Sequence, residues 1–248
     1  MPGDSVAEGF PSQPGRLTRD MPAQRFDHPF FSRVWTMKSA RESRALRELR
    51  RENLAGLGGR VLEVGAGTGT NFGLYPDTVR EVVALEPEPR LFAHAMHVAT
   101  TAPVPVTVLP SAIETLSAAQ PFDAVVCALV LCSVADLGDA LRQINSVITD
   151  GGELRYLEHV ASSGWPGRLQ RLADATVWPR LSGNCHTHRD TERALVEAGF
   201  TICTARHERV PIPTPLPAWA PAPSSEFALG RAIKTGQSTT SAHLRDRR

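Results

Sequence analysis

The chain has 248 residues, of which 42% are hydrophobic and 21% are charged, and its formal net charge is +1. This length and composition fit one globular domain with a sizeable core, and the near-neutral charge argues against a nucleic-acid partner. No apolar run is long enough to span a membrane, and we find no signal-peptide core. The four cysteines form no C-x-x-C pair, so a reduced, cytoplasmic location is expected.

The first part of the chain has the composition of a tail and is followed by helical patterns. Residues 1–25 are rich in Pro, Gly, Ser and charge, so we predict a disordered tail there. A short helix is expected from His28, with three aromatic residues on one face: Phe30, Phe31 and Trp35. A charged helix is expected over 41–54, and its Arg residues should form a solvated face because Glu residues interleave with them.

The stretch over residues 60–71 predicts a nucleotide-type cradle. Its apolar run over 61–64 is typical of a buried parallel strand. Three glycines follow at alternate positions, where the backbone can adopt positive φ and a ligand can approach it closely: Gly65, Gly67 and Gly69. A helix expected over 71–75 would add free N–H groups and a partial positive charge.

The residues around these glycines narrow the class of ligand that the loop could bind. Their G-x-G-x-G spacing differs from the G-x-G-x-x-G of dinucleotide sites, which argues against a nicotinamide cofactor, and no Lys-Ser or Lys-Thr pair follows to make a P-loop. Glu63 repels phosphate but suits a cationic ligand. Glu86 ends a second apolar strand roughly 20 positions after Gly65 and can accept both ribose hydroxyls. The alternative interpretation is a tight turn with an acidic surface residue.

Strand and helix patterns alternate beyond the glycines. We predict strands over 81–86, 104–109, 122–128, 153–159, 200–206 and 227–233, and helices over 89–99, 137–147, 165–180 and 189–198. This order predicts an α/β doubly wound, mainly parallel sheet in one domain over 26–234, with a flexible tail over 235–248. Ligands bind such sheets at the carboxyl ends of the strands, where five predicted strand ends meet.

The motif E-V-G-A-G-T-G-T-N, followed by L-E-P, resembles the cofactor motif of class I S-adenosylmethionine-dependent methyltransferases. The phrases over 125–134 and 158–160 are similar to a bacterial subgroup and to microsomal methyltransferase-like proteins that methylate alkyl thiols. The resemblance covers about residues 28–233. It implies a Rossmann-like sheet of seven strands with an antiparallel edge strand, and S-adenosyl-L-methionine as the cofactor. The membrane anchor of the microsomal proteins is not expected here.

The resemblance also implies which residues hold the cofactor. Glu63 would contact the amino group of its methionine part, Glu86 the ribose, and Pro87 the adenine. Many related enzymes bind the adenine amino group with an Asp after the third strand. This chain has no Asp there, so backbone groups would hydrogen-bond to the adenine amino group instead. The complete implied set is Glu63, Gly65, Ala66, Gly67, Thr68, Gly69, Asn71, Glu86, Pro87, Ala112, Ile113 and Leu129.

The methyl acceptor is expected to be a small, partly apolar molecule, with thiols ranked before phenols and quinols. Its pocket would be lined by residues for which core packing is the alternative role: Phe30, Phe31, Trp35, Leu131, Cys132 and Trp178. His159 and His186 are the candidate catalytic bases, although either could simply hydrogen-bond a loop.

Other functions stay open at this point. The cysteines and histidines fit no common zinc spacing, so no metal is predicted. A non-catalytic cofactor-binding module and a phospholipid amine N-methyltransferase share the same cofactor core. The sequence leaves the oligomeric state open.

Overall fold

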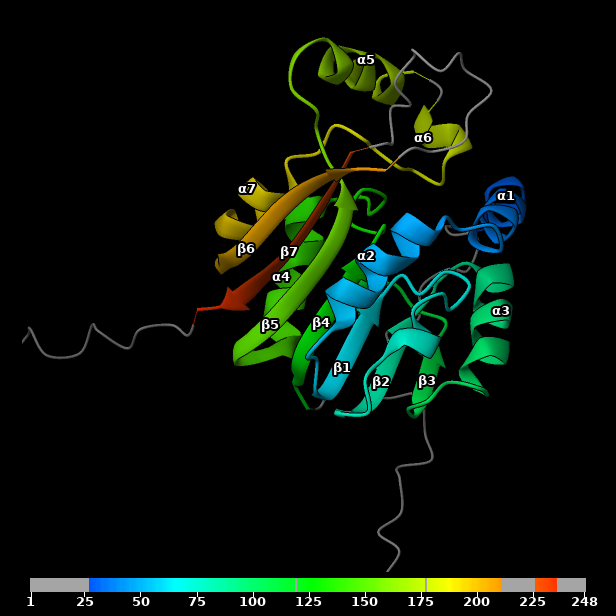
Figure 1. The fold of residues 1–248 in the computed structure, drawn as a ribbon, viewed down its shortest axis with the longest axis vertical. Coiled ribbons are helices and arrows are strands. Elements are labelled where there is room, and N and C mark those ends of the chain that lie inside the picture. Colours follow the sequence, from blue (N-terminus) through cyan, green and yellow to red (C-terminus); the bar gives the residue numbers. More distant parts are fainter. Residues whose placement is uncertain (1–26, 119, 177, 211–225, 236–248) are drawn as a thin grey trace, which may run out of the picture.

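A seven-stranded sheet organises the computed structural model, which describes residues 27–118, 120–176, 178–210 and 226–235. The strands are β1 (Gly59–Val64), β2 (Val79–Leu85), β3 (Val106–Leu109), β4 (Phe122–Ala128), β5 (Ile148–His159), β6 (Phe200–Arg209) and β7 (Glu226–Lys234). They are arranged in the order β3-β2-β1-β4-β5-β7-β6 (Figure 1). The predicted tail over 1–25 lies outside the described residues, as does the predicted tail over 235–248 except for Thr235.

Strands β1 to β5 are parallel, and β7 is antiparallel to both β5 and β6. The predicted mainly parallel sheet is therefore confirmed, and the antiparallel strand lies one place in from the β6 edge. In the centre of the sheet, Leu62 pairs with Val83 on one side and with Val125 on the other. This register places the carboxyl ends of β1, β2 and β4 at one edge.

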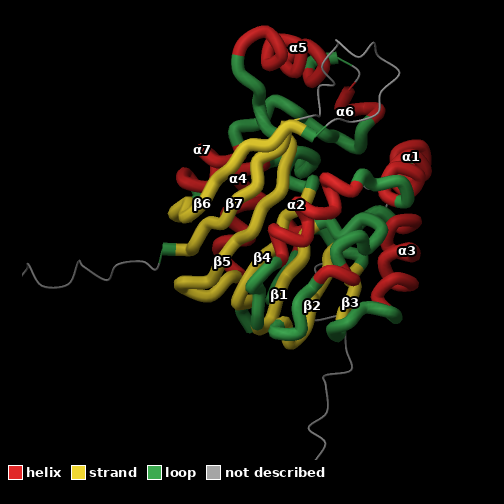
Figure 2. The backbone as a smooth tube through the Cα atoms, viewed as in Figure 1, coloured by secondary structure: helices red, strands yellow, loops and turns green. Residues whose placement is uncertain are grey.

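Helices cover both faces of the sheet (Figures 1 and 2). They are α1 (Pro29–Ser39), α2 (Arg44–Leu54), α3 (Pro89–Ala99), α4 (Leu137–Val147), α5 (Gly164–Asp174), α6 (Trp178–Leu181) and α7 (Thr191–Glu197), with 3₁₀ turns η3 (Phe72–Leu74) and η4 (Ile113–Thr115). Leu141 of α4 and Leu195 of α7 pack in one core with Leu62. Ala95 of α3 packs with Val61 on the opposite face. The sheet is thus doubly wound, as predicted.

The predicted helix over 71–75 is wrong, because only the single 3₁₀ turn η3 forms there. Gly73 lowers the helical preference of this segment, and Pro76 follows it directly. A residue before proline is disfavoured in the helical region, and Tyr75 accordingly has extended angles, with φ −63° and ψ 134°. The backbone after the glycines therefore leaves the sheet edge within one turn.

The predicted helix over 165–180 is divided into α5 and α6. Pro179 would clash with a preceding carbonyl inside one long helix, but it is tolerated in the first turn of α6. Leu169 and Leu172 of α5 are 40% and 61% exposed. Among the described residues, no helix combines the length and the apolar character needed to cross a membrane.

Candidate active site

The glycine loop after β1 requires glycine for both backbone angle and space. Gly65, Gly67 and Gly69 all have positive φ, at 67°, 59° and 78°. A Cβ atom on Gly67 would lie 2.8 Å from the indole nitrogen of Trp35, and one on Gly65 would collide with the side chain of Val130. Glycine at these positions therefore lets neighbouring side chains approach the backbone closely, and this loop at the carboxyl end of β1 is called here the cradle.

Neighbouring residues fix the position of this loop. The N–H of Ala66 donates to the carbonyl of Leu85 at 2.9 Å, and the N–H of Gly69 donates to Ala66 at 2.9 Å. Thr68 is half-buried between them. The loop is therefore tied to the end of β2, where Glu86 lies.

Glu86 connects the glycine loop to the start of α3. One carboxylate oxygen accepts the N–H of Gly67 at 2.7 Å, and the other accepts the N–H of Glu88 at 2.9 Å. Burial raises the pKa of Glu86 to about 7. A carboxylate offers about four acceptor positions, so lone pairs remain for ribose hydroxyls. Pro87, expected beside the adenine, is half-buried next to it.

Glu63 lies at the centre of a buried polar network. Its carboxylate accepts from the Asn71 amide at 2.9 Å and from the Tyr75 hydroxyl at 2.7 Å. Arg50 donates to the Asn71 oxygen at 3.1 Å and to Glu42 at 2.7 Å. Burial raises the pKa of Glu63 to about 7, so a cationic ligand group nearby would favour its ionised form.

This network corrects one expectation and adds one residue. Arg50 was expected on the solvated face of the charged helix, but it is buried because it pairs with Glu42 and Asn71. Tyr75 was not predicted to take part, since nothing in its spacing places its hydroxyl against Glu63. Asn71 was expected to touch the cofactor. Its amide instead donates to Glu63 and accepts from Arg50, so it holds the Glu63 carboxylate in place.

Helix α1 covers two loops at the carboxyl edge. The rings of Phe31 and Trp35 stack with their centroids 5.8 Å apart. A Cβ atom on Gly183 would lie 2.6 Å from the Phe31 ring, just as one on Gly67 would meet Trp35. Phe31 and Trp35 therefore span the glycine loop and the loop over 182–188. Phe30 departs from the expectation, since it is 64% exposed on another side of the helix.

The turn after β4 is held by a buried carboxylate. Glu158 accepts the N–H groups of Val130 at 2.9 Å and Leu131 at 2.8 Å, and burial raises its pKa. Leu129 has a positive φ of 62°, which is unusual for a side chain of this type. Leu131 was expected to line the acceptor pocket, but it is fully buried in the core and is not available there.

Three side chains from separate segments meet at this edge and are called here the Cys–His cluster: Cys132, His159 and Cys185. The two sulfurs are 3.6 Å apart, and each lies 3.7 Å from Nδ1 of His159. All three residues are buried. The hydrogen bond with Cys132 lowers the pKa of Cys185. The sequence did not predict this meeting, because 53 positions separate the cysteines.

The loop over 182–188 brings two further candidates to the cluster. The N–H of His186 donates to the carbonyl of Cys132 at 2.7 Å. Burial and the charge of Arg189 lower the pKa of the His186 imidazole, so it is neutral at pH 7. Trp178 is half-buried, and its indole N–H helps to lower the pKa of Cys185, although no hydrogen bond of ordinary geometry joins it to a described residue.

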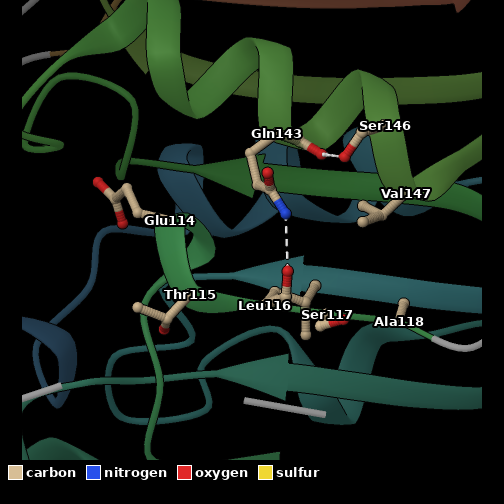
Figure 3. A pocket seen from close by; sticks show the side chains of 8 residues that line it. All are labelled: Glu114, Thr115, Leu116, Ser117, Ala118, Gln143, Ser146 and Val147. Atoms are coloured by element: carbon tan, nitrogen blue, oxygen red, sulfur yellow. Dashed lines mark hydrogen bonds between the residues drawn. The ribbon is translucent and has the colours of Figure 1, made fainter. Parts of the chain in front are cut away.

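The turn after β3 presents backbone to the same edge. Ala112 and Ile113 are buried, and the side chain of Ile113 belongs to the core, so only main-chain atoms are available for an adenine. A hollow of about 260 Å³ lies beside this turn, between η4 and α4, where Gln143 donates to the carbonyl of Leu116 at 2.7 Å (Figure 3). None of the predicted site residues lines it.

Comparison with known proteins assigns this site to a family. A family model described as a methyltransferase domain matches residues 37–205. The thiol S-methyltransferase TMT1B of Homo sapiens is 33% identical over 220 residues, which cover 83% of this chain and 85% of that protein. The range matched by the family model includes the glycine loop, Glu86 and the Cys–His cluster.

Solved structures share the fold. A putative methyltransferase of Bacillus halodurans has a TM-score of 0.61 and 16% identity, covering 78% of this chain and 100% of that one. The N-methyltransferase NodS of Bradyrhizobium japonicum, in complex with S-adenosyl-L-homocysteine, has a TM-score of 0.56 and 17% identity, covering 87% and 93%. A glycine loop with three positive φ angles and two buried carboxylates, those of Glu63 and Glu86, fit the corresponding cofactor in this chain. The chain therefore belongs to the class I S-adenosylmethionine-dependent methyltransferases.

Proposed function

We propose that this enzyme methylates the sulfur of a small, partly apolar thiol. The observation that carries the proposal is the position of α1, whose Phe31 and Trp35 cover both the glycine loop and the loop of Cys185 and His186. An acceptor held between these loops would lie under aromatic rings, which favours an apolar molecule oriented by few polar groups. The similarity to a thiol S-methyltransferase along most of both chains supports sulfur as the acceptor atom.

The residues would act mainly by alignment and exclusion of water. S-adenosylmethionine, when bound, supplies an electrophilic methyl carbon and a neutral thioether leaving group. Glu86 and the glycine loop would hold the cofactor's ribose and methionine parts, with Glu63 beside the amino group. Phe31 and Trp35 would keep water from the junction, so that the acceptor sulfur meets the methyl carbon in line.

The thiol also has to lose a proton, because the thiolate is the nucleophile. His186 is suited to accept it, since its imidazole is neutral at pH 7 and only partly buried. His159 is less suited, because its Nδ1 faces two cysteine sulfurs. Phenols and quinols rank second, because their higher pKa leaves them less completely deprotonated.

A labelled-methyl assay tests the proposal. Radiolabelled S-adenosylmethionine is incubated with panels of small thiols, phenols, quinols and amines, including phospholipid amines. Thiols should give the highest turnover, and the Gly67→Val variant should give none, because its side chain would collide with Trp35 and Gly67 has a positive φ that valine strongly disfavours. Preferred transfer to an amine would replace this proposal with N-methylation. Binding of S-adenosylhomocysteine without transfer to any acceptor would identify a non-catalytic module.

A further inference from the structure

We propose that Cys132, His159 and Cys185 bind a zinc ion whose fourth coordination position receives the acceptor thiol as a thiolate. The identity of this fourth ligand rests on the proposed function, whereas the three protein ligands do not. Two thiolates and one imidazole, with one open position, form a donor set that catalytic zinc sites use.

The distances within the Cys–His cluster match the edges of a tetrahedral zinc site. Zinc lies about 2.3 Å from sulfur and about 2.0 Å from nitrogen, so ideal angles give about 3.8 Å between two sulfurs and about 3.5 Å between sulfur and nitrogen. The observed separations are 3.6 Å for the two sulfurs and 3.7 Å for each sulfur and Nδ1. A disulfide would require about 2.05 Å. Hydrogen-bonded thiols would have similar separations, and the metal titration below separates the two cases.

Each ligand is held by an element that contacts its neighbours, so the cluster is preorganised. Cys132 follows the turn that Glu158 fixes, and its own N–H also reaches that carboxylate at 3.3 Å. Cys185 precedes His186, whose N–H binds the Cys132 carbonyl at 2.7 Å. The His159 ring packs 4.8 Å from the ring of Phe227. Ligands that are fixed in this way favour metal binding more than three independently mobile side chains would.

The charges around the cluster suit a buried zinc ion. Two thiolates neutralise Zn²⁺, so the site would place no net charge in the interior. Arg189 donates to the carbonyls of Leu131 at 2.7 Å and Val134 at 2.8 Å, on either side of Cys132. An acceptor thiolate would add one negative charge, and this guanidinium is close enough to interact with both cysteines.

The cluster lies where a bound thiolate could meet the methyl group. Val130, whose side chain abuts Gly65, is two residues before Cys132. Phe31 covers Gly183, two residues before Cys185, while Trp35 covers Gly67. Both cysteines therefore belong to segments that contact the cofactor cradle or the helix that covers it.

The chemistry balances without a further reactant. A thiol that binds zinc releases its proton to solvent or to His186, because a coordinating thiol is deprotonated. The sulfur electron pair then forms the new bond to the methyl carbon, and the bond between that carbon and the sulfonium breaks with its electrons going to the leaving thioether. The methylated product is a neutral thioether and a weak ligand, so the next thiol can displace it.

Metal analysis of the full chain tests the site. The chain is purified under reducing conditions without chelator, and zinc is measured by mass spectrometry. We expect one zinc per chain. The metal is then removed and cobalt(II) is titrated in, which should give sulfur-to-cobalt charge-transfer absorption. Cys132→Ser, Cys185→Ser and His159→Gln should each weaken metal binding by roughly a hundredfold or more. Exposed Cys203 provides the control, and Cys203→Ser should bind metal normally.

Two readouts separate this inference from the proposed function. S-adenosylhomocysteine affinity should be nearly unchanged in the cluster variants, which shows that they are folded. A small alkyl thiol, but not the matching alcohol, should alter the cobalt spectrum. Metal binding that depends on the cluster, without thiol methylation, would support the site and overturn only the proposed reaction. Full thiol methylation by metal-free protein would overturn the role of zinc in binding the acceptor thiolate. Metal binding unaffected by Cys132→Ser and Cys185→Ser, or a native Cys132–Cys185 disulfide, would overturn the zinc site itself.

Discussion

Replacing Glu86 with Gln tests the cofactor site by a change of one atom. Both carboxylate oxygens accept backbone N–H groups, from Gly67 at 2.7 Å and Glu88 at 2.9 Å. The glutamine amide would place its NH₂ group against one of these two backbone N–H groups, so that hydrogen bond would be lost. The substitution would also remove the negative charge that strengthens a hydrogen bond to a ribose hydroxyl. A hydrogen bond to a charged group contributes about 1.5–3 kcal/mol. The variant should therefore bind S-adenosylhomocysteine roughly 10- to 150-fold more weakly.

Isothermal titration calorimetry measures this loss directly. Glu81→Gln is the matched control, because Glu81 lies near the other end of the same strand and pairs with Arg60 at 2.8 Å. It should bind S-adenosylhomocysteine like the parent chain. If Glu86→Gln stays folded by circular dichroism and keeps its affinity within about twofold, the ribose contact is refuted.

Three further predictions follow from individual contacts. Gly67→Val should abolish S-adenosylhomocysteine binding, because its Cβ would meet Trp35, whereas Gly73→Ala has open space and should bind normally in the same titration. Burial raises the pKa of Glu63 to about 7, so its stabilising contribution is present below its ordinary pKa of 4.5 and is lost as the pH rises to about 7. From about pH 5 to about pH 8, urea unfolding should show the cofactor-free parent losing up to about 3 kcal/mol more stability than Glu63→Gln. Equal losses would contradict the burial of an ionisable carboxyl at this position. His186→Ala should lower thiol turnover about a hundredfold with unchanged S-adenosylhomocysteine affinity, and full turnover would show that it is not the base.

Features with local causes could be predicted from the sequence. The limits of α3 and α4 agree with the predicted helices over 89–99 and 137–147, because a proline begins the first and Asp136 caps the second. The glycine loop was predicted for the same reason, since positive φ and close approach depend on glycine itself. The break between α5 and α6 has a local cause too, because Pro179 cannot lie inside one long helix, although the predicted helix over 165–180 ran through it.

Features that depend on distant partners could not be predicted. Arg50 resembles its solvated Arg neighbours along the helix, and only the fold places Asn71 and Glu42 around it. In the sequence, Glu158 is simply an acidic residue near the end of a predicted strand. Only the fold places the turn after β4 beside it, where three N–H groups donate to its carboxylate.

The Cys–His cluster is the clearest case of this limit. Zinc motifs are found in sequence by short spacings, but these ligands come from the turn after β4, the end of β5 and the loop over 182–188. Phe30 and Phe31 show the same limit on a smaller scale. Neighbouring positions on a helix point about 100° apart, so only one of the two can face Gly183.

Competition within one acceptor molecule tests the central claim, thiol methylation, most directly. Para-mercaptophenol carries a thiol and a phenol on one ring, so differences in delivery to the site cancel. It is incubated with the enzyme and S-adenosylmethionine bearing a trideuterated methyl group, and the product is identified by mass spectrometry and NMR, with Gly67→Val as the background control. The account predicts that the label is found on sulfur and depends on the intact cradle. Enzyme-dependent label on oxygen, or transfer no faster than with Gly67→Val, would contradict it.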